Sequence, residues 1–449
     1  MNQRREINPG RLLIIGYAGI ITIGAVLLLL PFSTRNGVSV TDAVFTSTSA
    51  LCVTGLIVKD TAIDFTFWGK LIILILIQIG GLGYMTISTS FFFFLGKKIS
   101  LRDRILFKES VNFLSYENLM RFAWRIFRIT IVVELTGAIL LYFYFVKKFE
   151  PLCAAGHALF HSVSAFCNAG FSTFSENLTL FNNTWGVPLI TALLIITGGI
   201  GFIVISDIYY VLVKKAKKDL SLHTKLVLRT TLFLLIFGTI FILLYEGQRS
   251  LSQFPLPLKI VHSFFQAVTP RTAGFNTVNI SNFSSVTLFL LMIFMFIGAS
   301  PGGTGGGIKT STFTLLILWV KELLYGRYKN NVTVMRRSIP QEQAMRAFLI
   351  VALSGFLILV SFFLVLLIDH ISPKKLIFEI FSAFGTVGLS LGSAINPNCS
   401  YVYDLSWFGK SIIIILMVIG KVGTLTLGSA LIKPRPLEFS YQEESIAVG

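Results

Sequence analysis

Four short segments of the chain align with one another without gaps, and this repetition constrains the fold more than any other feature. They read FTSTSALCVTGL at 45–56, FHSVSAFCNAGF at 160–171, FFQAVTPRTAGF at 264–275 and FEIFSAFGTVGL at 378–389. In each segment a Phe precedes a Gly by ten residues, and Leu or Phe follows the Gly. The four glycines are Gly55, Gly170, Gly274 and Gly388. The sequence therefore predicts four units built on one plan.

Long apolar runs flank every repeated segment. Apolar residues make up 54% of the chain and charged residues 13%, about half the charged content of a soluble domain. One run precedes each segment, at 12–30, 126–146, 226–245 and 348–368, and a second run follows, with glycine clusters at 80–83, 198–201, 298–301 and 420–423. Runs that approach ~20 residues can cross a bilayer. The prediction is an all-α integral membrane protein with eight transmembrane helices in a pseudo-fourfold arrangement around one pore.

The repeat divides the chain into four pore units, which we place at 1–96, 97–218, 219–330 and 331–449. The first apolar run is long and lacks an A-x-A site, so we expect a retained span rather than a cleaved signal. Lys and Arg gather at the N-terminus, at 97–125, 214–225 and 321–346, and near residue 433. The positive-inside rule then predicts a multi-pass protein of the cell membrane with both termini cytoplasmic.

The net charge of +17 does not indicate nucleic-acid binding. A nucleic-acid site needs a basic face on a soluble domain, and here the basic residues sit in short segments between spans. We therefore expect membrane lipid around the protein and no nucleic acid.

The repeated segments have the character of pore loops. Each holds about ten residues of helical pattern, too few to cross a bilayer, followed by a loop centred on Gly. Glycine permits positive φ, so successive carbonyl oxygens can face one side and replace the hydration shell of an alkali ion. We predict an alkali-cation selectivity filter of backbone carbonyls from Val53, Thr54, Gly55, Asn168, Ala169, Gly170, Thr272, Ala273, Gly274, Thr386, Val387 and Gly388. The alternative is that these glycines only allow close helix packing.

The third unit differs from the others because a Gly-rich stretch interrupts its second apolar run at 297–310. Such a sequence cannot form an ordinary helix, and we predict an intramembrane gating loop. Its residues are Gly298, Pro301, Gly302, Gly303, Thr304, Gly305, Gly306, Gly307 and Lys309, with Lys421 at the same level of the fourth unit. The alternatives are a kinked helix and a phosphate-binding loop. The latter requires Gly where Ile308 stands and a soluble βαβ unit.

Ionisable residues inside apolar runs are functional candidates. Lys421 suits an electrostatic barrier or a latch for the loop, or a lysine paired within the bundle, whereas Lys309 is equally compatible with snorkelling. For Glu134 we expect a structural pair rather than a proton relay. For Arg271 we expect pairing with a pore-loop carboxylate, as structural support rather than as an ion contact. We expect His161 to have a hydrogen-bonded packing role. Glu379 is expected to tune the outer mouth of the pore, and Asp207 to cap or pair at its inner rim.

The fourfold plan, together with VTGL, NAGF, TAGF and TVGL, resembles the Trk/Ktr/HKT superfamily of potassium transporters. The length and the eight predicted spans are most similar to the membrane subunit of bacterial Ktr systems. The resemblance implies potassium preference, because Gly rather than Ser stands at 55, and a homodimer with one pore per protomer. It also implies a cytoplasmic ring of nucleotide-binding, KtrA-like regulatory subunits and possible Na⁺ dependence. The family usually has Arg where this chain has Lys421.

Two other functions were weighed against a gated potassium channel-like transporter. An alternating-access symporter coupled to Na⁺ or H⁺ commonly has inverted repeats, whereas these four units run in one orientation. A membrane enzyme needs a catalytic or metal-ligand constellation, and none has usable spacing in the sequence. We therefore predict no enzymatic activity and no bound cofactor other than the transported potassium ion.

Overall fold

The computed structural model describes residues 9–83, 86, 119–213, 219–327, 331–369 and 371–431, and most of these residues are helical. Both termini and most of the basic segment 97–125, on which the predicted orientation partly depends, lie outside the described residues.

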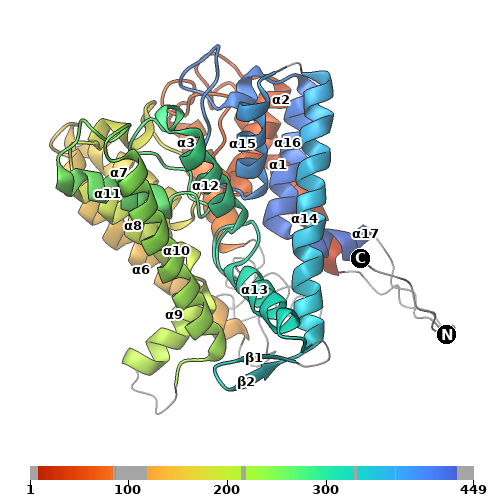
Figure 1. Ribbon diagram of the computed structural model, residues 1–449. Coiled ribbons are helices and arrows are strands. Elements are labelled where there is room, and N and C mark those ends of the chain that lie inside the picture. The colour runs from red at the N-terminus through yellow and green to blue at the C-terminus, as the bar shows by residue number, and fades with distance from the viewer. Residues whose placement is uncertain are drawn as a thin grey trace.

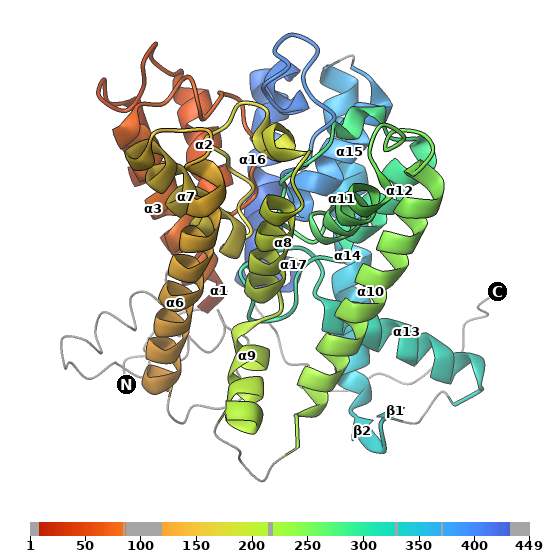
Figure 2. The same ribbon diagram turned by 90° about the vertical axis from the view of Figure 1, so that its left-hand side faces the viewer.

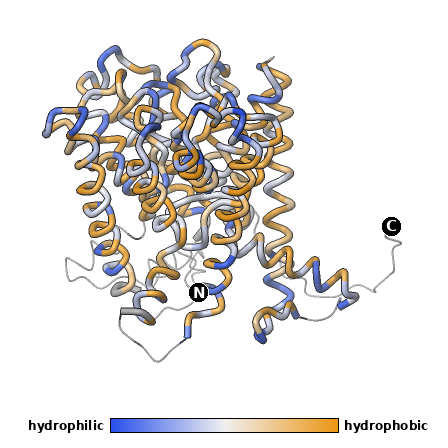
Figure 3. The backbone as a smooth tube through the Cα atoms, turned by 60° about the vertical axis from the view of Figure 1, so that its left-hand side comes forward, coloured by the Kyte–Doolittle hydropathy of each residue, from blue (hydrophilic) through white to orange (hydrophobic). Residues whose placement is uncertain are grey.

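Four long helices coincide with the first spans predicted for the four units. They are α1 (Pro9–Leu29), α6 (Leu119–Phe145), α10 (Leu222–Glu246) and α14 (Gln341–Ile368). Within the described part of the chain, these four are long and apolar enough to cross a membrane by themselves. Figure 3 shows hydrophobic residues dominating their length and hydrophilic residues gathered at the two ends of the molecule.

A shorter helix packs against each long helix and leads into the repeated loop. These pore helices are α2 (Val40–Leu51), α7 (Pro151–Phe166), α11 (Leu256–Val268) and α15 (Pro373–Phe384). Local sequence explains where they begin. The Ser39 hydroxyl caps α2 by accepting from the Asp42 amide, and Pro lies in the first turn of α7, α11 and α15, where no intrahelical amide bond is lost.

The second helix of each unit is shorter than a full span. Unit 1 has α3 (Phe67–Leu82), unit 2 has α8 (Gly186–Gly199) and α9 (Phe202–Ile208), which continues in a π-helical turn (Tyr209–Val213), and unit 3 has α12 (Ser285–Phe296) and α13 (Thr310–Leu324). Unit 4 has α16 (Trp407–Val422) and α17 (Thr424–Leu431). The break predicted in the third unit is confirmed.

The expectation of one uninterrupted second helix needs correction in the other units. Gly83, Gly201 and Gly423 end or interrupt these helices with φ of +77°, +99° and +97°. An α-helix cannot continue through a positive φ, and α8 and α9 are consequently bent by 96°. Figure 2 shows the short connection between α8 and α9, with α9 below α8. Within the described residues, a positive-φ glycine therefore ends α3 and interrupts the second helices of units 2 and 4, and the break in the third unit is longer.

The units follow one another in a closed ring. Helix α3 contacts the next unit's pore helix α7, α8 contacts α11, α12 contacts α15, and α16 contacts α2 of the first unit. In Figure 1 the first and last units, drawn in red and blue, accordingly lie side by side. The buried core is continuous across these junctions: one cluster joins Val53 and Ile77 of unit 1 to Phe166 and Ala169 of unit 2.

Two short strands, β1 (Val332–Val334) and β2 (Arg337–Ile339), form an antiparallel hairpin that the sequence did not suggest. Val332 and Val334 pack with Leu315 and Trp319 of α13. The remaining elements are 3₁₀ turns at Asn177–Phe181, Ile280–Asn282 and Tyr401–Asp404. The hairpin is thus attached to the helix that directly follows the Gly-rich break.

Candidate functional site: four loops and the segment beneath them

The four repeated loops share one unusual backbone conformation. The residue two positions before each glycine has positive φ: Val53 +56°, Asn168 +60°, Thr272 +79° and Thr386 +49°. The glycines also have positive φ, with Gly55 at +88°, Gly170 at +71°, Gly274 at +74° and Gly388 at +87°. Non-glycine residues rarely adopt this conformation, so its recurrence at equivalent positions in all four loops indicates a specific structural requirement.

Hydrogen bonds to the pore helices fix this conformation. The residue before each glycine donates its amide to a carbonyl near the end of its own pore helix: Thr54 to Ser49 at 2.8 Å, Ala169 to Ser164 at 2.7 Å, Ala273 to Thr269 at 2.9 Å and Val387 to Ser382 at 2.8 Å. Because the amide and carbonyl of adjacent residues point in different directions, bonding the amide outward leaves carbonyl oxygens facing the centre.

A hydroxyl at the end of each pore helix completes this support, and sequence reasoning missed these residues. The Ser49 hydroxyl donates to the Leu56 carbonyl at 2.7 Å and accepts from the Gly55 amide at 3.1 Å. The remaining units use Ser164, Thr269 and Ser382 in one or the other of these bonds. A Ser six residues before the glycine is visible in three of the four aligned segments, so this signal was available.

The glycines close a ring in chain order. A Cβ added to Gly170 would lie 2.8 Å from the Ala273 carbonyl oxygen and 3.1 Å from the Gly274 Cα. Equivalent atoms on Gly55, Gly274 and Gly388 would overlap the carbonyl oxygens of Ala169, Val387 and Thr54, respectively. Each glycine therefore faces the carbonyl that precedes the next unit's glycine, and the fourth unit returns to the first. Four backbone oxygens surround a single axis.

The Gly-rich segment of the third unit lies against the other loops. The Ser300 and Thr304 amides donate to the carbonyls of Gly199 at 2.9 Å and Gly198 at 3.2 Å, both in unit 2. The Gly307 amide donates to the Gly420 carbonyl of unit 4 at 3.2 Å. The segment therefore bridges three units at the level where the second helices break.

Every residue predicted for the gate lies in this bridge or touches it. Gly298 donates to the Ile308 carbonyl at 2.9 Å, Gly302 accepts from the Phe202 amide at 2.9 Å, and Gly303 donates to Ser300 at 3.1 Å. A side chain on Gly201 would approach the Pro301 carbonyl, and those on Gly305 and Gly306 would collide with the hydroxyls of Thr272 and Thr386.

The two intramembrane lysines bind neighbouring carbonyls of the same segment. The Lys309 ammonium donates to the Gly305 carbonyl at 2.7 Å, and the Lys421 ammonium donates to the Thr304 carbonyl. Lys421 comes from unit 4 and so joins two units, whereas Lys309 closes a turn of its own unit. Both ammonium groups therefore contact the Gly-rich segment, and the latch role of Lys421 stays a prediction.

Among the other ionisable residues, Glu134 accepts from the Gln78 amide at 3.3 Å and lies 3.8 Å from the Cys167 thiol. It thus joins the first two units. Asp207 accepts from the Ser221 amide at 2.9 Å, which is the expected capping role. His161 bonds to the Ser172 hydroxyl at 3.0 Å and stacks on Phe174, and Glu379 accepts from the Val402 amide at 3.2 Å.

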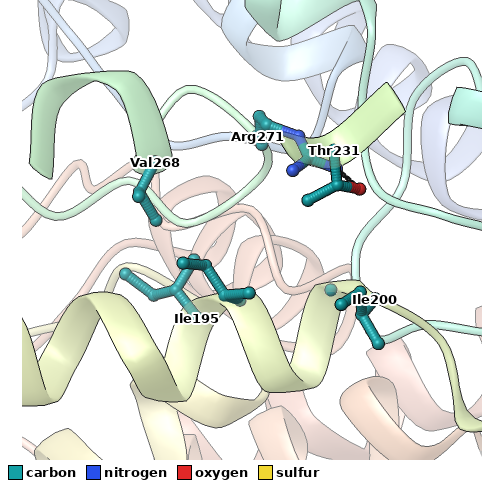
Figure 4. Close-up of a pocket in the computed structure, with 7 residues that line it drawn as sticks. Ile195, Ile200, Thr231, Val268 and Arg271 are labelled. Atoms are coloured by element: carbon teal, nitrogen blue, oxygen red, sulfur yellow. Dashed lines mark hydrogen bonds between the residues drawn. The ribbon is translucent and has the colours of Figure 1, made fainter. Parts of the chain in front are cut away.

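The pairing of Arg271 with a carboxylate is not observed. Its guanidinium, 7% exposed, reaches the Thr231 hydroxyl at 3.4 Å, and its Nε has no hydrogen-bond partner among the described residues. Figure 4 shows Arg271 and Thr231 on one side of a small pocket whose other walls include Ile195, Ile200 and Val268. The prediction was wrong: the α10 residue that Arg271 reaches is Thr231, and the α10 carboxylate, Glu246, instead accepts from Ser284 and Thr287.

Fold and site together define a membrane protein of the cation-transport class, in which four related loops present backbone oxygens to one axis. Comparison with known families makes the assignment specific. The family described as TrkH, cation transport protein, matches residues 16–441, and the chain belongs to this family.

Full-length relatives agree with this assignment. The chain is 38% identical over 446 residues to the Ktr system potassium uptake protein B of Bacillus subtilis, covering 99% of this chain and 97% of the relative. Its identity to the Vibrio alginolyticus protein of the same name is 37%, with 98% and 94% covered. The potassium/sodium uptake protein NtpJ of Enterococcus hirae is 37% identical, with 99% and 98% covered.

A solved structure shares the fold. The potassium transporter TrkH from Vibrio parahaemolyticus matches with a TM-score of 0.74, covering 96% of this chain and 87% of that one at 20% sequence identity. The chain is therefore a membrane transporter whose family consists of transport proteins and not enzymes.

Proposed function

We propose that this protein takes up potassium through a central pore, with the four Gly-centred loops as its selectivity filter. The observation that carries the proposal is the closed ring in which each glycine faces the carbonyl of the next unit. Carbonyl oxygens held by hydrogen bonds to the pore helices can replace the water around a K⁺ ion without rearrangement. The names of the Bacillus and Vibrio relatives, potassium uptake proteins of Ktr systems, support potassium as the ion.

The segment from Gly298 to Lys309 is proposed as the gate. It bridges three units and is held by bonds to Gly198, Gly199 and Gly420 and by the Lys421 latch. Irregular backbone at membrane depth requires polar surroundings, and the glycine content lets the segment rearrange without side-chain clashes. An ion that leaves the filter would reach the cytoplasm when this segment moves aside.

The wider assembly follows from the same proposal. Eight spans in four units, divided near residues 97, 219 and 331, would put both termini on one side of the membrane, and the positive-inside rule favours the cytoplasm. A homodimer acting with a cytoplasmic nucleotide-binding regulatory ring fits the name of the Ktr relatives, which implies a multi-component system.

Coupling to a second ion is the alternative function. The name of the Enterococcus relative includes sodium, and broken helices at midplane are common in secondary transporters. Potassium flux into proteoliposomes with and without a Na⁺ or H⁺ gradient separates the two mechanisms. A channel-like pore conducts down the potassium gradient alone.

The direct test is K⁺ and Na⁺ uptake in a bacterial strain that lacks its own potassium transport. Gly55→Ser should lower the preference for K⁺ over Na⁺, since a side chain at Gly55 meets the Ala169 carbonyl of the next loop. Deletion of 302–307 should raise the flux. If neither variant differs from wild type at equal membrane abundance, the filter and gate assignments are both wrong.

A further inference from the structure

The residues two positions before the glycines differ among the units in a way that the filter alone does not explain. Three of them carry polar side chains, Asn168, Thr272 and Thr386, and the first unit has Val53. All four have positive φ. The three polar side chains are buried, and they lie on the side of the filter that the Gly-rich segment covers.

The Thr386 hydroxyl is bonded directly to that segment. It accepts from the Gly306 amide at 2.9 Å, and a Cβ on Gly306 would run into both the hydroxyl and the Thr386 methyl group. The absence of a side chain at 306 therefore permits this contact. In the present structure, the proposed gate occupies an oxygen lone pair of Thr386.

The Thr272 hydroxyl donates its proton to a side chain of the neighbouring unit. With its amide turned to donate to the carbonyls of Ala165 and Ile195, Asn168 accepts from the Thr272 hydroxyl at 3.1 Å. The Thr272 hydroxyl proton is thus donated to Asn168, and the oxygen lone pairs take no part in this bond. Gly305 packs so closely against the hydroxyl that a Cβ at 305 would overlap it. Gly305 and Gly306 together cover the oxygens of two units.

We propose that the hydroxyl oxygens of Thr272 and Thr386 form an inner cation subsite below the carbonyl ring, which the Gly305–Gly306 backbone covers and K⁺ occupies when that backbone withdraws. This inference rests on the proposed function and adds side-chain oxygens to a site so far described by its backbone. Neutral oxygens are the ligands that an alkali ion accepts in place of water. The Asn168 side chain holds one of them in the correct orientation.

Competition between the ion and the segment follows from the charges nearby. The ammonium groups of Lys309 and Lys421 bind the carbonyls of Gly305 and Thr304, the segment's residues beside the two hydroxyls. A K⁺ ion in the subsite would lie close to two positive charges as long as the segment stays. Ion binding and segment closure therefore exclude each other, and by linkage a higher K⁺ concentration favours withdrawal of the segment.

The test uses Thr386→Val, which removes the hydroxyl and keeps the branched shape. Val53 occupies the equivalent position of the first unit with φ +56°, so the backbone conformation accommodates Val. With the segment intact, we expect a higher basal Rb⁺ flux into proteoliposomes because one bond that holds the segment is lost. With 302–307 deleted, we expect the K⁺ concentration for half-maximal flux to rise about two- to ten-fold.

Two further variants keep the experiment decisive. Thr386→Ser retains the oxygen and should restore the wild-type K⁺ dependence in the same background. Thr130→Val is the matched control, since the Thr130 hydroxyl is buried in α6 and has no hydrogen-bond partner within the described part of the chain, and it should leave K⁺ dependence unchanged. Should the deletion not fold, Lys421→Met, which removes the bond to Thr304, supplies a second background with a loosened segment.

The outcomes separate this proposal from the one on which it rests. If Gly55→Ser and the deletion change selectivity and flux but Thr386→Val leaves K⁺ dependence unaltered with the segment removed, the subsite is refuted and the hydroxyl only anchors the segment. If Gly55→Ser and the deletion have no effect, the filter and gate themselves are refuted. A two- to ten-fold shift with Thr386→Val that Thr386→Ser reverses supports the subsite.

Discussion

The glycine ring makes a graded prediction about single methyl groups. Alanine at Gly170 adopts φ +71°, which costs an L-residue about 1–2 kcal/mol. Its Cβ would meet the Ala273 oxygen at 2.8 Å, so the neighbouring loop must move by a fraction of an ångström. At Gly55, Gly274 and Gly388 the added atom overlaps the neighbouring carbonyl, and the displacement is larger. We therefore expect Gly170→Ala to be the mildest of four disruptive substitutions.

The expected size follows from the strain energy. If 1–2 kcal/mol of strain is relieved by displacing the carbonyls, discrimination between K⁺ and Na⁺ falls by about 5- to 30-fold. The assay is uptake of both ions by the four alanine variants in a strain without other potassium uptake, normalised to membrane abundance. At Gly388 and Gly274 the loss should exceed that at Gly170.

The matched control lies in one of the pore helices. Gly156 is in α7, and a Cβ there meets no atom within 4 Å. Gly156→Ala should leave transport unchanged and stabilise the helix by about 0.5–1 kcal/mol. The reasoning is refuted if the four ring variants behave like Gly156→Ala, or if Gly170→Ala is the most harmful of them.

Three further predictions concern other parts of the site. Lys421→Met should raise basal K⁺ flux by about ten- to one-hundred-fold, because it removes a charge-assisted hydrogen bond to Thr304. Lys421→Arg should keep the Gly-rich segment closed and the flux low. Equal flux in the wild type and the Met variant would exclude the latch. Arg271→Met should raise the free energy of unfolding of the purified protein by about 1–3 kcal/mol, and its thermal midpoint with it. The reason is that the substitution removes a buried charge whose described hydrogen bond is a long one to Thr231. A lower midpoint would point to an additional partner. A membrane-impermeant maleimide added outside intact cells should label Cys153, the one exposed cysteine of the chain, and Cys153→Ser should abolish labelling; labelling only after permeabilisation would invert the predicted orientation.

Much of the fold could be predicted from local patterns. The four long apolar helices and the four pore helices were predictable because apolar length and the Phe-to-Gly spacing are properties of contiguous sequence. The breaks at Gly201 and Gly423 were not predicted, since a glycine inside an apolar run is compatible with both a continuous helix and a positive φ. The neighbouring carbonyls and loops decide between the two.

The candidate site also contains residues that the sequence predicted and residues that it did not. The glycines, their repeat and the Gly-rich segment were evident in the sequence, as was Lys421 as an unusual charge. The prediction of a carboxylate partner for Arg271 was wrong. The hydroxyls of Ser49, Ser164 and Ser382, which support the loop backbone, were overlooked. The hydroxyls bond within their own segment, so they were a local signal that was missed. The Thr231 partner of Arg271 lies on the long helix α10 of the same unit, and a single sequence contains no record of which helix positions face a given loop.

By itself, the sequence determined that the chain has four like units, that they are apolar enough for a membrane, and that each carries one glycine where backbone must bend. Only the tertiary structure decided that each glycine faces the carbonyl of the next unit, so that four loops form one ring. It also decided that Gly305 and Gly306 lie against the Thr272 and Thr386 hydroxyls. Conformational preference is local and can be read from residue type, whereas closure of a ring depends on contacts between distant residues, such as Gly388 and Thr54.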